Sequence, residues 1–212
     1  MENKEQQLLA KTFKGLEEVL AKELIEIGAN NVQIERRAVS FTGDLAMMYK
    51  SNLCCRTATR ILMPLKTFKA KTADEVYEMA KDIEWDTIME TNQTFQIDAT
   101  VFSNDFRNSQ FVTYRVKDAI VDYFNEKLGK RPSVRLTNPD FYINVHISQT
   151  DCTILLDSSG ESLHKRGYRS SQTEAPISEV LAAGMLEMAE WNGQCDFVDP
   201  MCGSGTFLIE AA

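Results

Sequence analysis

The feature that most restricts the fold is the order in which two hydrophobic periodicities alternate along the first 65 residues. Apolar residues recur at helical spacing in some segments and at every second position in others. Strands are expected over 8–12, 32–34, 39–41 and 60–65, and helices over 16–27 and 45–53. Gly28 stands where a helix C-cap would lie, and Asp44 stands where an N-cap would lie. The order strand, helix, strand, strand, helix, strand predicts a small α+β unit of the ferredoxin-like kind over residues 1–65.

A second α+β unit is expected over residues 66–157. Thr72 and Glu75 have the spacing of a capping box at the start of a helix. A broad apolar stripe over 111–128 predicts a longer helix, which Gly129 would end. Strands are expected over 95–101, 133–136, 141–147 and 153–156.

The chain changes character after residue 157. Residues 158–175 are polar, carry several basic side chains and have no periodicity, so they predict an interdomain linker. A helix is expected from Pro176, since proline is favoured in the first helical turn, and a short strand is expected over 196–199. A glycine-containing loop and another helix follow at once. This order is typical of the ligand-binding edge of an open α/β sheet, so residues 176–212 are expected to begin an α/β domain.

Composition restricts the compartment and the kinds of partner. A net charge of −8 argues against a surface covered in positive potential, but it leaves room for local basic patches. The sequence has no stretch of about 18 uncharged apolar residues, and its polar start lacks the pattern of a secretory signal. The five cysteines are irregularly spaced, and only two histidines accompany them, so no metal site is expected. We therefore expect a cytoplasmic protein that binds no metal.

The string most informative about chemistry runs from Asp199 to Ala212 and reads D-P-M-C-G-S-G-T-F-L-I-E-A-A. Gly203 and Gly205 lack side chains, so a ligand could approach the backbone closely, and the following helix would point free N–H groups toward it. A phosphate-binding P-loop is excluded because the string has no lysine. The dinucleotide fingerprint fails because Leu208 occupies its third glycine position.

The whole string closely resembles the cofactor loop of S-adenosylmethionine-dependent methyltransferases that modify amino groups of nucleobases. The resemblance implies that the loop lies along the methionine and ribose of the cofactor. The residues implied to bind S-adenosylmethionine are Pro176, Asp199, Pro200, Cys202, Gly203, Ser204, Gly205 and Thr206.

Segments throughout the chain resemble RNA methyltransferases that contain a THUMP domain. These segments are K-G-L-E at 14–17, R-T-A-T-R-I-L at 56–62, K-D-A-I-V-D at 117–122, T-N-P-D at 137–140, L-H-K-R-G-Y-R at 163–169 and A-P-I-S-E-V-L-A-A at 175–183. The resemblance is strongest to bacterial enzymes that methylate the exocyclic amine of a guanine in large-subunit ribosomal RNA. It implies a ferredoxin-like unit, a THUMP RNA-binding domain and the first part of a Rossmann-like methyltransferase domain.

One departure from the family pattern concerns catalysis. The catalytic signature of the family is Asn/Asp-Pro-Pro-Tyr or a close variant, and no such string is present. Asn138-Pro139-Asp140 is not that signature, because it precedes the cofactor loop and lacks the second proline and the aromatic residue. We therefore assign no catalytic residue. We expect the chain to be the N-terminal part of a longer enzyme and to be inactive by itself.

Two basic clusters are the candidates for RNA binding. Residues 107–135 hold seven basic and three acidic side chains, and 165–169 hold three basic residues around one tyrosine. Lysine and arginine neutralise phosphates, and tyrosine can stack an unpaired base. A solvated helix face and a packed linker tyrosine are the structural alternatives. The candidate RNA-binding residues are Arg107, Arg115, Lys117, Arg131, Arg135, Lys165, Arg166, Tyr168 and Arg169.

Three other functions compete with an RNA methyltransferase. The cofactor loop would also suit a DNA adenine methyltransferase, although the resemblance of the upstream segments favours RNA. A stand-alone RNA-binding protein would need no cofactor. A THUMP domain attached to thiouridine-forming chemistry is disfavoured by the D-P-M-C-G-S-G-T loop.

Overall fold

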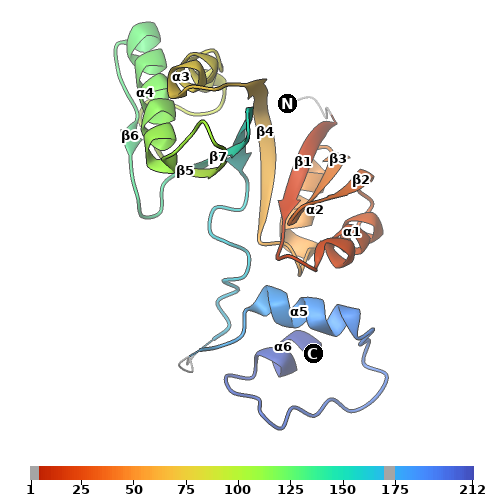
Figure 1. Ribbon diagram of the computed structural model, residues 1–212. Helices are drawn as coiled ribbons and strands as arrows, with labels where there is room; N and C mark the ends of the chain where they lie inside the picture. Colours follow the sequence, from red (N-terminus) through yellow and green to blue (C-terminus); the bar gives the residue numbers. More distant parts are fainter. Residues whose placement is uncertain (1–4, 170–174) are drawn as a thin grey trace. The chain divides into compact units, whose positions relative to one another are not determined.

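The structure is a computed structural model that describes residues 5–169 and 175–212, and it divides into two compact units (Figure 1). The first unit consists of two separate stretches, Met1–Leu62 and Glu161–Ala212. The second unit is the continuous stretch Met63–Gly160. These units are groups of residues in mutual contact, and their limits differ from the segments 1–65, 66–157, 158–175 and 176–212 that the sequence predicts. Those segment boundaries therefore stay predictions.

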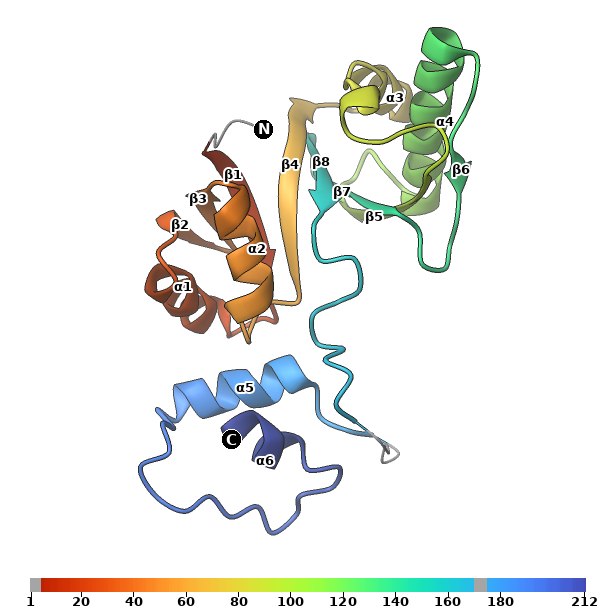
Figure 2. The same cartoon turned by 180° about the vertical axis from the view of Figure 1, so that it is seen from behind.

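The N-terminal stretch of the first unit has the predicted order of elements. These are β1 (Gln6–Lys11), α1 (Glu17–Glu26), β2 (Asn30–Glu35), β3 (Ala38–Gly43), α2 (Leu45–Cys54) and β4 (Arg60–Lys69). The strands lie in the order β2-β3-β1-β4, each antiparallel to its neighbour, with α1 and α2 beside them (Figure 2). Leu8 of β1 and Phe41 of β3 are cross-strand partners and are both fully buried. The ferredoxin-like part of the predicted fold is confirmed.

Both predicted helix caps in this stretch are confirmed. The Asp44 carboxylate accepts a hydrogen bond of 2.8 Å from the Met47 backbone N–H at the start of α2. Gly28 follows α1 with a φ of +95°, a backbone conformation that glycine adopts without steric cost.

The second unit has a mixed sheet with helices packed against it. Its elements are α3 (Ala73–Lys81), η1 (Trp85–Thr87), β5 (Thr94–Phe102), α4 (Ser109–Leu128), β6 (Ser133–Val134), β7 (Phe141–Ser148) and β8 (Asp151–Asp157). The strand order is β4-β8-β7-β5-β6, where β4 passes from the first unit into the second. The strand β5 is parallel to β6 and β7, whereas β7 and β8 are antiparallel.

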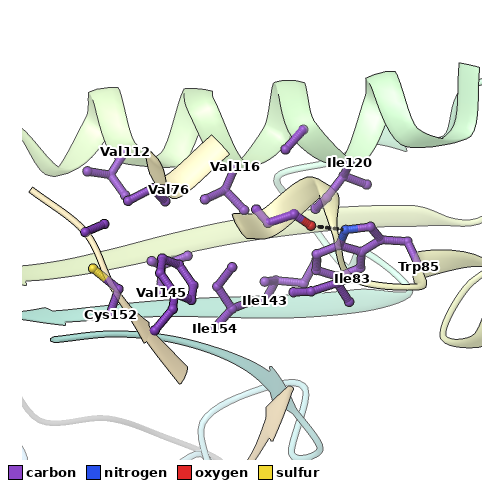
Figure 3. Packing of buried hydrophobic residues seen from close by; sticks show 14 of the residues in the cluster. Val76, Ile83, Trp85, Val112, Val116, Ile120, Ile143, Val145, Cys152 and Ile154 are labelled. Carbon is purple, nitrogen blue, oxygen red and sulfur yellow. Dashed lines mark hydrogen bonds between the residues drawn. The ribbon is translucent and has the colours of Figure 1, made fainter. Parts of the chain in front are cut away.

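The core of the second unit lies between α4 and its sheet (Figure 3). Val116 and Ile120 of α4 point toward Ile143 and Ile154 of the strands, and all four are almost fully buried. Trp85 is also fully buried, and its indole N–H donates a hydrogen bond of 2.8 Å to the Ala80 carbonyl. The polar end of this large ring is therefore satisfied inside the core.

The cap of α3 differs in detail from the expected capping box. The Thr72 hydroxyl accepts from the Glu75 backbone N–H at 3.2 Å, as expected. The Glu75 carboxylate accepts from the Lys71 N–H at 2.7 Å, one residue before the N-cap. The left-handed Gly129, with a φ of +63°, ends α4 as predicted.

The C-terminal stretch of the first unit contains α5 (Glu179–Met188) and α6 (Thr206–Ala211). The predicted strand over 196–199 was wrong, because these residues have no regular secondary structure. A strand exists through hydrogen bonds to a neighbouring strand, and in the part of the chain that the structure describes no strand pairs with this segment. The helix expected from Pro176 begins three residues later, at Glu179.

Candidate cofactor site

The loop between residues 199 and 205 is held by its own short hydrogen bonds. The Asp199 carboxylate accepts from the Met201 backbone N–H at 3.0 Å. The Gly205 N–H donates to the Cys202 carbonyl at 2.7 Å. Met201, Cys202 and Gly203 are exposed. The loop is therefore a tight turn that presents its backbone to the surface.

Two glycines give this turn its shape. Gly203 has a φ of +54° and Gly205 a φ of +76°, both in the left-handed region. A Cβ on Gly203 would come no closer than 4.0 Å to the Met201 carbonyl oxygen, and a Cβ on Gly205 would meet no atom within 4 Å. The space beside both residues is open, so a ligand can approach the backbone there.

The loop leads directly into α6, whose first residue is fixed by the segment before α5. The Thr206 hydroxyl accepts a hydrogen bond of 3.1 Å from the Arg169 guanidinium. Arg169 also donates to the Ile177 carbonyl, and its Nε lies 3.4 Å from the buried Glu179 carboxylate. One largely buried arginine side chain thus connects the start of α6 to the start of α5.

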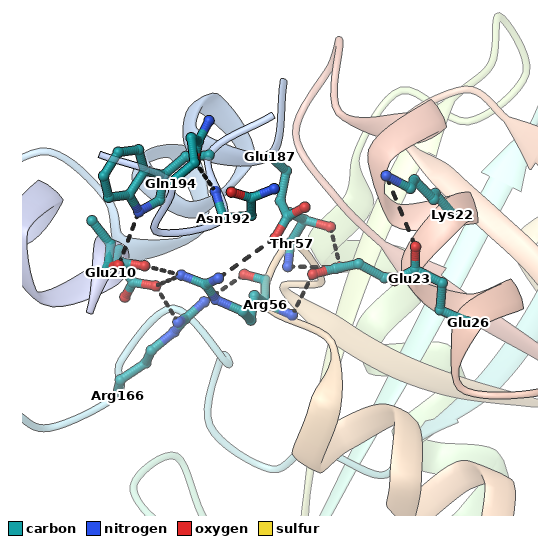
Figure 4. A network of polar contacts seen from close by, with 12 residues as sticks. Lys22, Glu23, Glu26, Arg56, Thr57, Arg166, Glu187, Asn192, Gln194 and Glu210 are labelled. Atoms are coloured by element: carbon teal, nitrogen blue, oxygen red, sulfur yellow. Dashed lines mark hydrogen bonds and ion pairs between the residues drawn. The ribbon is translucent and has the colours of Figure 1, made fainter. Parts of the chain in front are cut away.

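The other end of α6 is fixed through a buried carboxylate (Figure 4). Glu210 Oε2 lies 2.6 Å from Nη1 of Arg166 and 3.2 Å from Nη2 of Arg56. The Tyr168 hydroxyl donates to Glu210 Oε1 at 2.9 Å. Burial and this carboxylate raise the pKa of Tyr168 to about 12. A buried charge requires such partners, and Glu210 has three of them.

The backbone at Arg56 is held to helix α1 by hydrogen bonds. The Glu23 carboxylate of α1 accepts backbone N–H bonds from Arg56 at 3.0 Å and Thr57 at 3.1 Å (Figure 4). Burial raises the pKa of Glu23. The Arg56 side chain also lies 3.5 Å from Glu187 of α5. Hydrogen bonds and ion pairs therefore run from α1 through the 56–57 turn to α5 and α6.

The helix α5 packs closely on α1. A Cβ on Gly184 would lie 2.6 Å from the Leu16 side chain, so glycine permits the close approach. Pro176, predicted to contact the cofactor, is half-buried in the segment that precedes α5.

The predicted RNA-binding residues fall into three groups. Arg107, Arg131 and Arg135 of the second unit are exposed. Arg115 pairs with Asp74 at 2.5 Å and lies over the Tyr77 ring at 4.6 Å. Lys117 pairs with Asp118 at 2.8 Å, and Lys165 pairs with Glu161 at 3.7 Å. Arg166, Tyr168 and Arg169 are engaged at α6 as described above.

Sequence reasoning missed four residues of this site, namely Glu23, Arg56, Glu179 and Glu210. Glu210 carried a usable signal, because it follows Thr206 by four positions and therefore shares its helix face. Arg56 lies in the segment that resembles the family, but its sequence context does not identify its partner. Its role depends on contacts between residues 154 positions apart.

Among residues 5–169 and 175–212, no helix is long and apolar enough to cross a membrane. Within the same residues, no group of three or more His, Cys, Asp or Glu side chains is arranged to hold a metal ion.

Three sequence families match successive parts of the chain. Residues 7–62 match the RlmL ferredoxin-like domain, 70–157 match the THUMP domain, and 166–212 match the RMKL-like methyltransferase domain. A Synechocystis sp. protein provisionally named an RNA methyltransferase is 45% identical over 202 residues, covering 95% of this chain and 53% of that protein. The ribosomal RNA large subunit methyltransferase K/L of a Marinomonas sp. is 44% identical over 201 residues, covering 93% of this chain and 28% of that protein.

Solved structures agree with these matches. A Listeria monocytogenes protein described as a predicted N6-adenine-specific DNA methylase superposes with a TM-score of 0.87 at 33% identity, covering 98% of this chain and 55% of that one. SMU.472, provisionally named a methyltransferase and solved with S-adenosylhomocysteine (SAH), superposes with a TM-score of 0.85 at 32% identity, covering 100% of this chain and 55% of that one. The chain therefore spans about half, or less, of the length of each of these four proteins.

Proposed function

We propose that the intact protein methylates the exocyclic amine of a guanine in large-subunit ribosomal RNA. The chain matches the ferredoxin-like, THUMP and RMKL-like methyltransferase domains in the order expected for a THUMP-containing RNA methyltransferase. The observation that carries the proposal is the open, left-handed glycine loop at residues 199–205. Support comes from the SAH-bound neighbour, which is similar over the whole of this chain.

The residues of the loop fit S-adenosylmethionine. Backbone beside Gly203 and Gly205 is free of side chains on its open side, so an adenosyl or amino-acid moiety could lie against it. Ser204 and Thr206 place hydroxyl groups 3.3 Å apart at the end of the turn. The residues proposed to hold the cofactor are Pro176, Asp199, Pro200, Cys202, Gly203, Ser204, Gly205 and Thr206. When bound, S-adenosylmethionine would supply a methyl group on a positively charged sulfur. The nitrogen of a nucleobase amine would bond to the methyl carbon and lose a proton, and S-adenosylhomocysteine would leave.

RNA would be held by the second unit. Arg107, Arg131 and Arg135 are exposed, and Pro132, whose φ is fixed by its ring, lies with the short strand β6 between the last two. Exposed guanidinium groups supply affinity for phosphates without reading sequence. These three are the best placed of the predicted RNA contacts, because Arg115 and Lys117 have carboxylate partners within their own unit.

A DNA adenine methyltransferase is the second candidate, because the Listeria monocytogenes neighbour is described as an enzyme with that activity. The RNA proposal is preferred since the chain contains a THUMP match and since both curated relatives are named for RNA. The two candidates differ in product. Incubation of the intact protein with labelled S-adenosylmethionine and either ribosomal RNA or duplex DNA, followed by nucleoside mass spectrometry, should give N2-methylguanosine from RNA. N6-methyladenine from DNA alone would select the second candidate.

Cofactor binding is tested separately by calorimetry with SAH. In the intact protein, Gly203→Val should abolish SAH binding, because a branched side chain would occupy the open space and strain a left-handed backbone. The matched control is Gly193→Val, which puts the same side chain at a φ of +79° with no atom within 4 Å of the added Cβ. If Gly203→Val binds SAH as well as the control does, the loop has another role.

A further inference from the structure

We infer that the segment 166–169 is a brace for the cofactor loop, in which Arg169, Arg166 and Tyr168 act as positioning residues through α6. The inference rests on the proposed function, because it assigns these residues to the arrangement of the cofactor site. It also gives a role to side chains that the sequence alone placed among the RNA contacts.

The first reason is the length of α6. The helix has six residues, Thr206–Ala211. Isolated helices shorter than about 12–15 residues are marginal in water, because nucleation is costly. The conformation of α6, and of the loop that enters it, must therefore be maintained by contacts with other parts of the chain.

The second reason is where those contacts lie. Arg169 reaches the first residue of α6 at the Thr206 hydroxyl, 3.1 Å away. Arg166 and Tyr168 reach Glu210, one turn later, at 2.6 Å and 2.9 Å. Because residues four apart lie on one face of a helix, the segment 166–169 contacts a single face of α6 at two points.

The third reason is the burial of the charged groups. The Glu210 side chain is 2% exposed and that of Arg169 is 11% exposed. Both are too enclosed to contact a nucleic acid without rearrangement. A buried ion pair contributes little net stability on average, but removing one partner leaves an uncompensated charge. Such pairs fix geometry, and here the geometry that they fix is the start of α6 and hence the Gly203–Gly205 backbone.

The test uses the intact protein and two variants, Arg169→Met and Glu210→Gln. In each variant the new side chain has a length similar to that of the residue it replaces but carries no charge. Lys22→Met is the control, because it removes a cation whose partner, Glu26, lies 3.9 Å away at an exposed position of the same unit (Figure 4). Calorimetry measures the SAH dissociation constant and stoichiometry, and a filter-binding titration measures RNA affinity. Both brace variants should raise the SAH dissociation constant roughly tenfold or more, because small displacements of positioning groups have large effects. The SAH stoichiometry and the RNA affinity of both brace variants should equal those of the wild type. In Lys22→Met all three quantities should be unchanged.

Three outcomes would overturn the brace. Unchanged SAH affinity in both variants would show that the loop keeps its shape without these contacts. A lower stoichiometry with an unchanged dissociation constant would mean ordinary damage to folding. Weaker RNA binding with normal SAH binding would make Arg169 an RNA contact.

A readout without cofactor separates the brace from the proposed function. Hydrogen exchange of the 203–210 amides should accelerate in Arg169→Met and in Glu210→Gln but not in Lys22→Met. If the wild-type protein fails to bind SAH, the proposed function is wrong, and the exchange rates still decide whether 166–169 holds the loop. Equal exchange in all variants would overturn the brace whatever SAH does.

Discussion

Two pairs of closely spaced arginines, one pair in each unit, have different surroundings. Arg131 and Arg135 flank Pro132 and the short strand β6, and both are exposed. Arg166 and Arg169 stand three positions apart in a polar segment, but they contact the buried carboxylates Glu210 and Glu179. A basic cluster in a sequence therefore does not identify a nucleic-acid surface by itself. Whether each charge has a buried partner decides between the two uses.

The difference also separates two kinds of energetic role. Exposed cations contribute little to stability, yet they can neutralise phosphates. Cations beside buried carboxylates are needed so that those carboxylates are not left unpaired. The comparison thus predicts that changes at the first pair alter RNA affinity and that changes at the second alter the first unit itself.

The largest effect is expected from Glu210→Ala, which leaves Arg166 and Arg56 without their shared carboxylate. We expect a loss of about 2–3 kcal/mol in the free energy of unfolding of the first unit, below the usual range for a buried pair because both arginines are partly exposed. Urea unfolding would be followed by the fluorescence of Trp191, whose indole N–H donates to the Ala211 carbonyl at 3.0 Å. The control is Glu26→Ala, which removes the partner of Lys22 at an exposed site of the same unit. Equal losses of unfolding free energy in both variants would show that a buried carboxylate contributes no more to stability than an exposed one.

The next effect concerns RNA and not stability. Reversal of charge at Arg131 and Arg135 together should weaken binding to many RNA sequences by about tenfold and flatten the salt dependence by roughly one unit of slope per lost phosphate contact. The melting temperature should not move. Reversal at the exposed residues Lys14 and Arg36 of the first unit makes the same change of net charge and should leave RNA affinity as it was. Titrations at several salt concentrations distinguish these cases, and identical curves for the two double variants would refute a specific basic surface.

A smaller effect is expected from Tyr168→Phe, which removes one hydrogen bond to Glu210 and keeps the ring. The cost should be about 1 kcal/mol near neutral pH. The pKa of Tyr168 is raised from an ordinary value of 10 to about 12 in the folded protein. Its neutral form is thus favoured by folding, so its contribution is complete below pH 10 and is lost as the pH rises through 12.

The pH dependence gives a direct measurement. The difference in unfolding free energy between wild type and Tyr168→Phe should be constant below pH 10 and should shrink between pH 10 and 12. Other titrating groups cancel in this difference. RNA affinity should not change, and a loss of affinity in the phenylalanine variant would return the hydroxyl to the RNA-binding surface.

The smallest effect is expected from Lys22→Met, which removes an exposed pair separated by 3.9 Å. The change in unfolding free energy should be within about 0.5 kcal/mol. This variant tests whether an exposed cation of the first unit contributes as little to stability as expected, because Lys22 lies in the same unit as Arg166. A loss comparable to that of Glu210→Ala would mean that charge, and not burial, determines the effect.

The sequence predicted the elements that depend on local patterns. The caps at Asp44, Gly28 and Gly129 were readable because each places one residue type at a fixed offset from a periodic segment. The strand predicted at 196–199 failed for the opposite reason. Its short apolar pattern gives no information about a partner strand. In the described part of the chain no strand pairs with these residues, so they do not form a strand.

The candidate site was predictable only in part. The glycines at 203 and 205 indicated an open loop, and their left-handed backbone agrees with that expectation. The contacts of Arg166, Tyr168 and Arg169 could not be inferred, because their partners lie between 8 and 110 residues away along the chain. Only a folded backbone brings Glu210 to Arg56 across 154 positions.

The division of the first unit into two stretches has a consequence for biosynthesis. Residues Met63–Gly160 emerge from the ribosome between its two halves. At about 5–20 residues per second, these roughly 100 residues take about 5–20 seconds to translate. During that interval Leu16 has no Gly184 to pack against and Arg56 has no Glu210 to pair with. The nascent ferredoxin-like stretch therefore passes through a stage in which the Leu16 side chain and the Arg56 guanidinium lack the partners that they have in the folded unit.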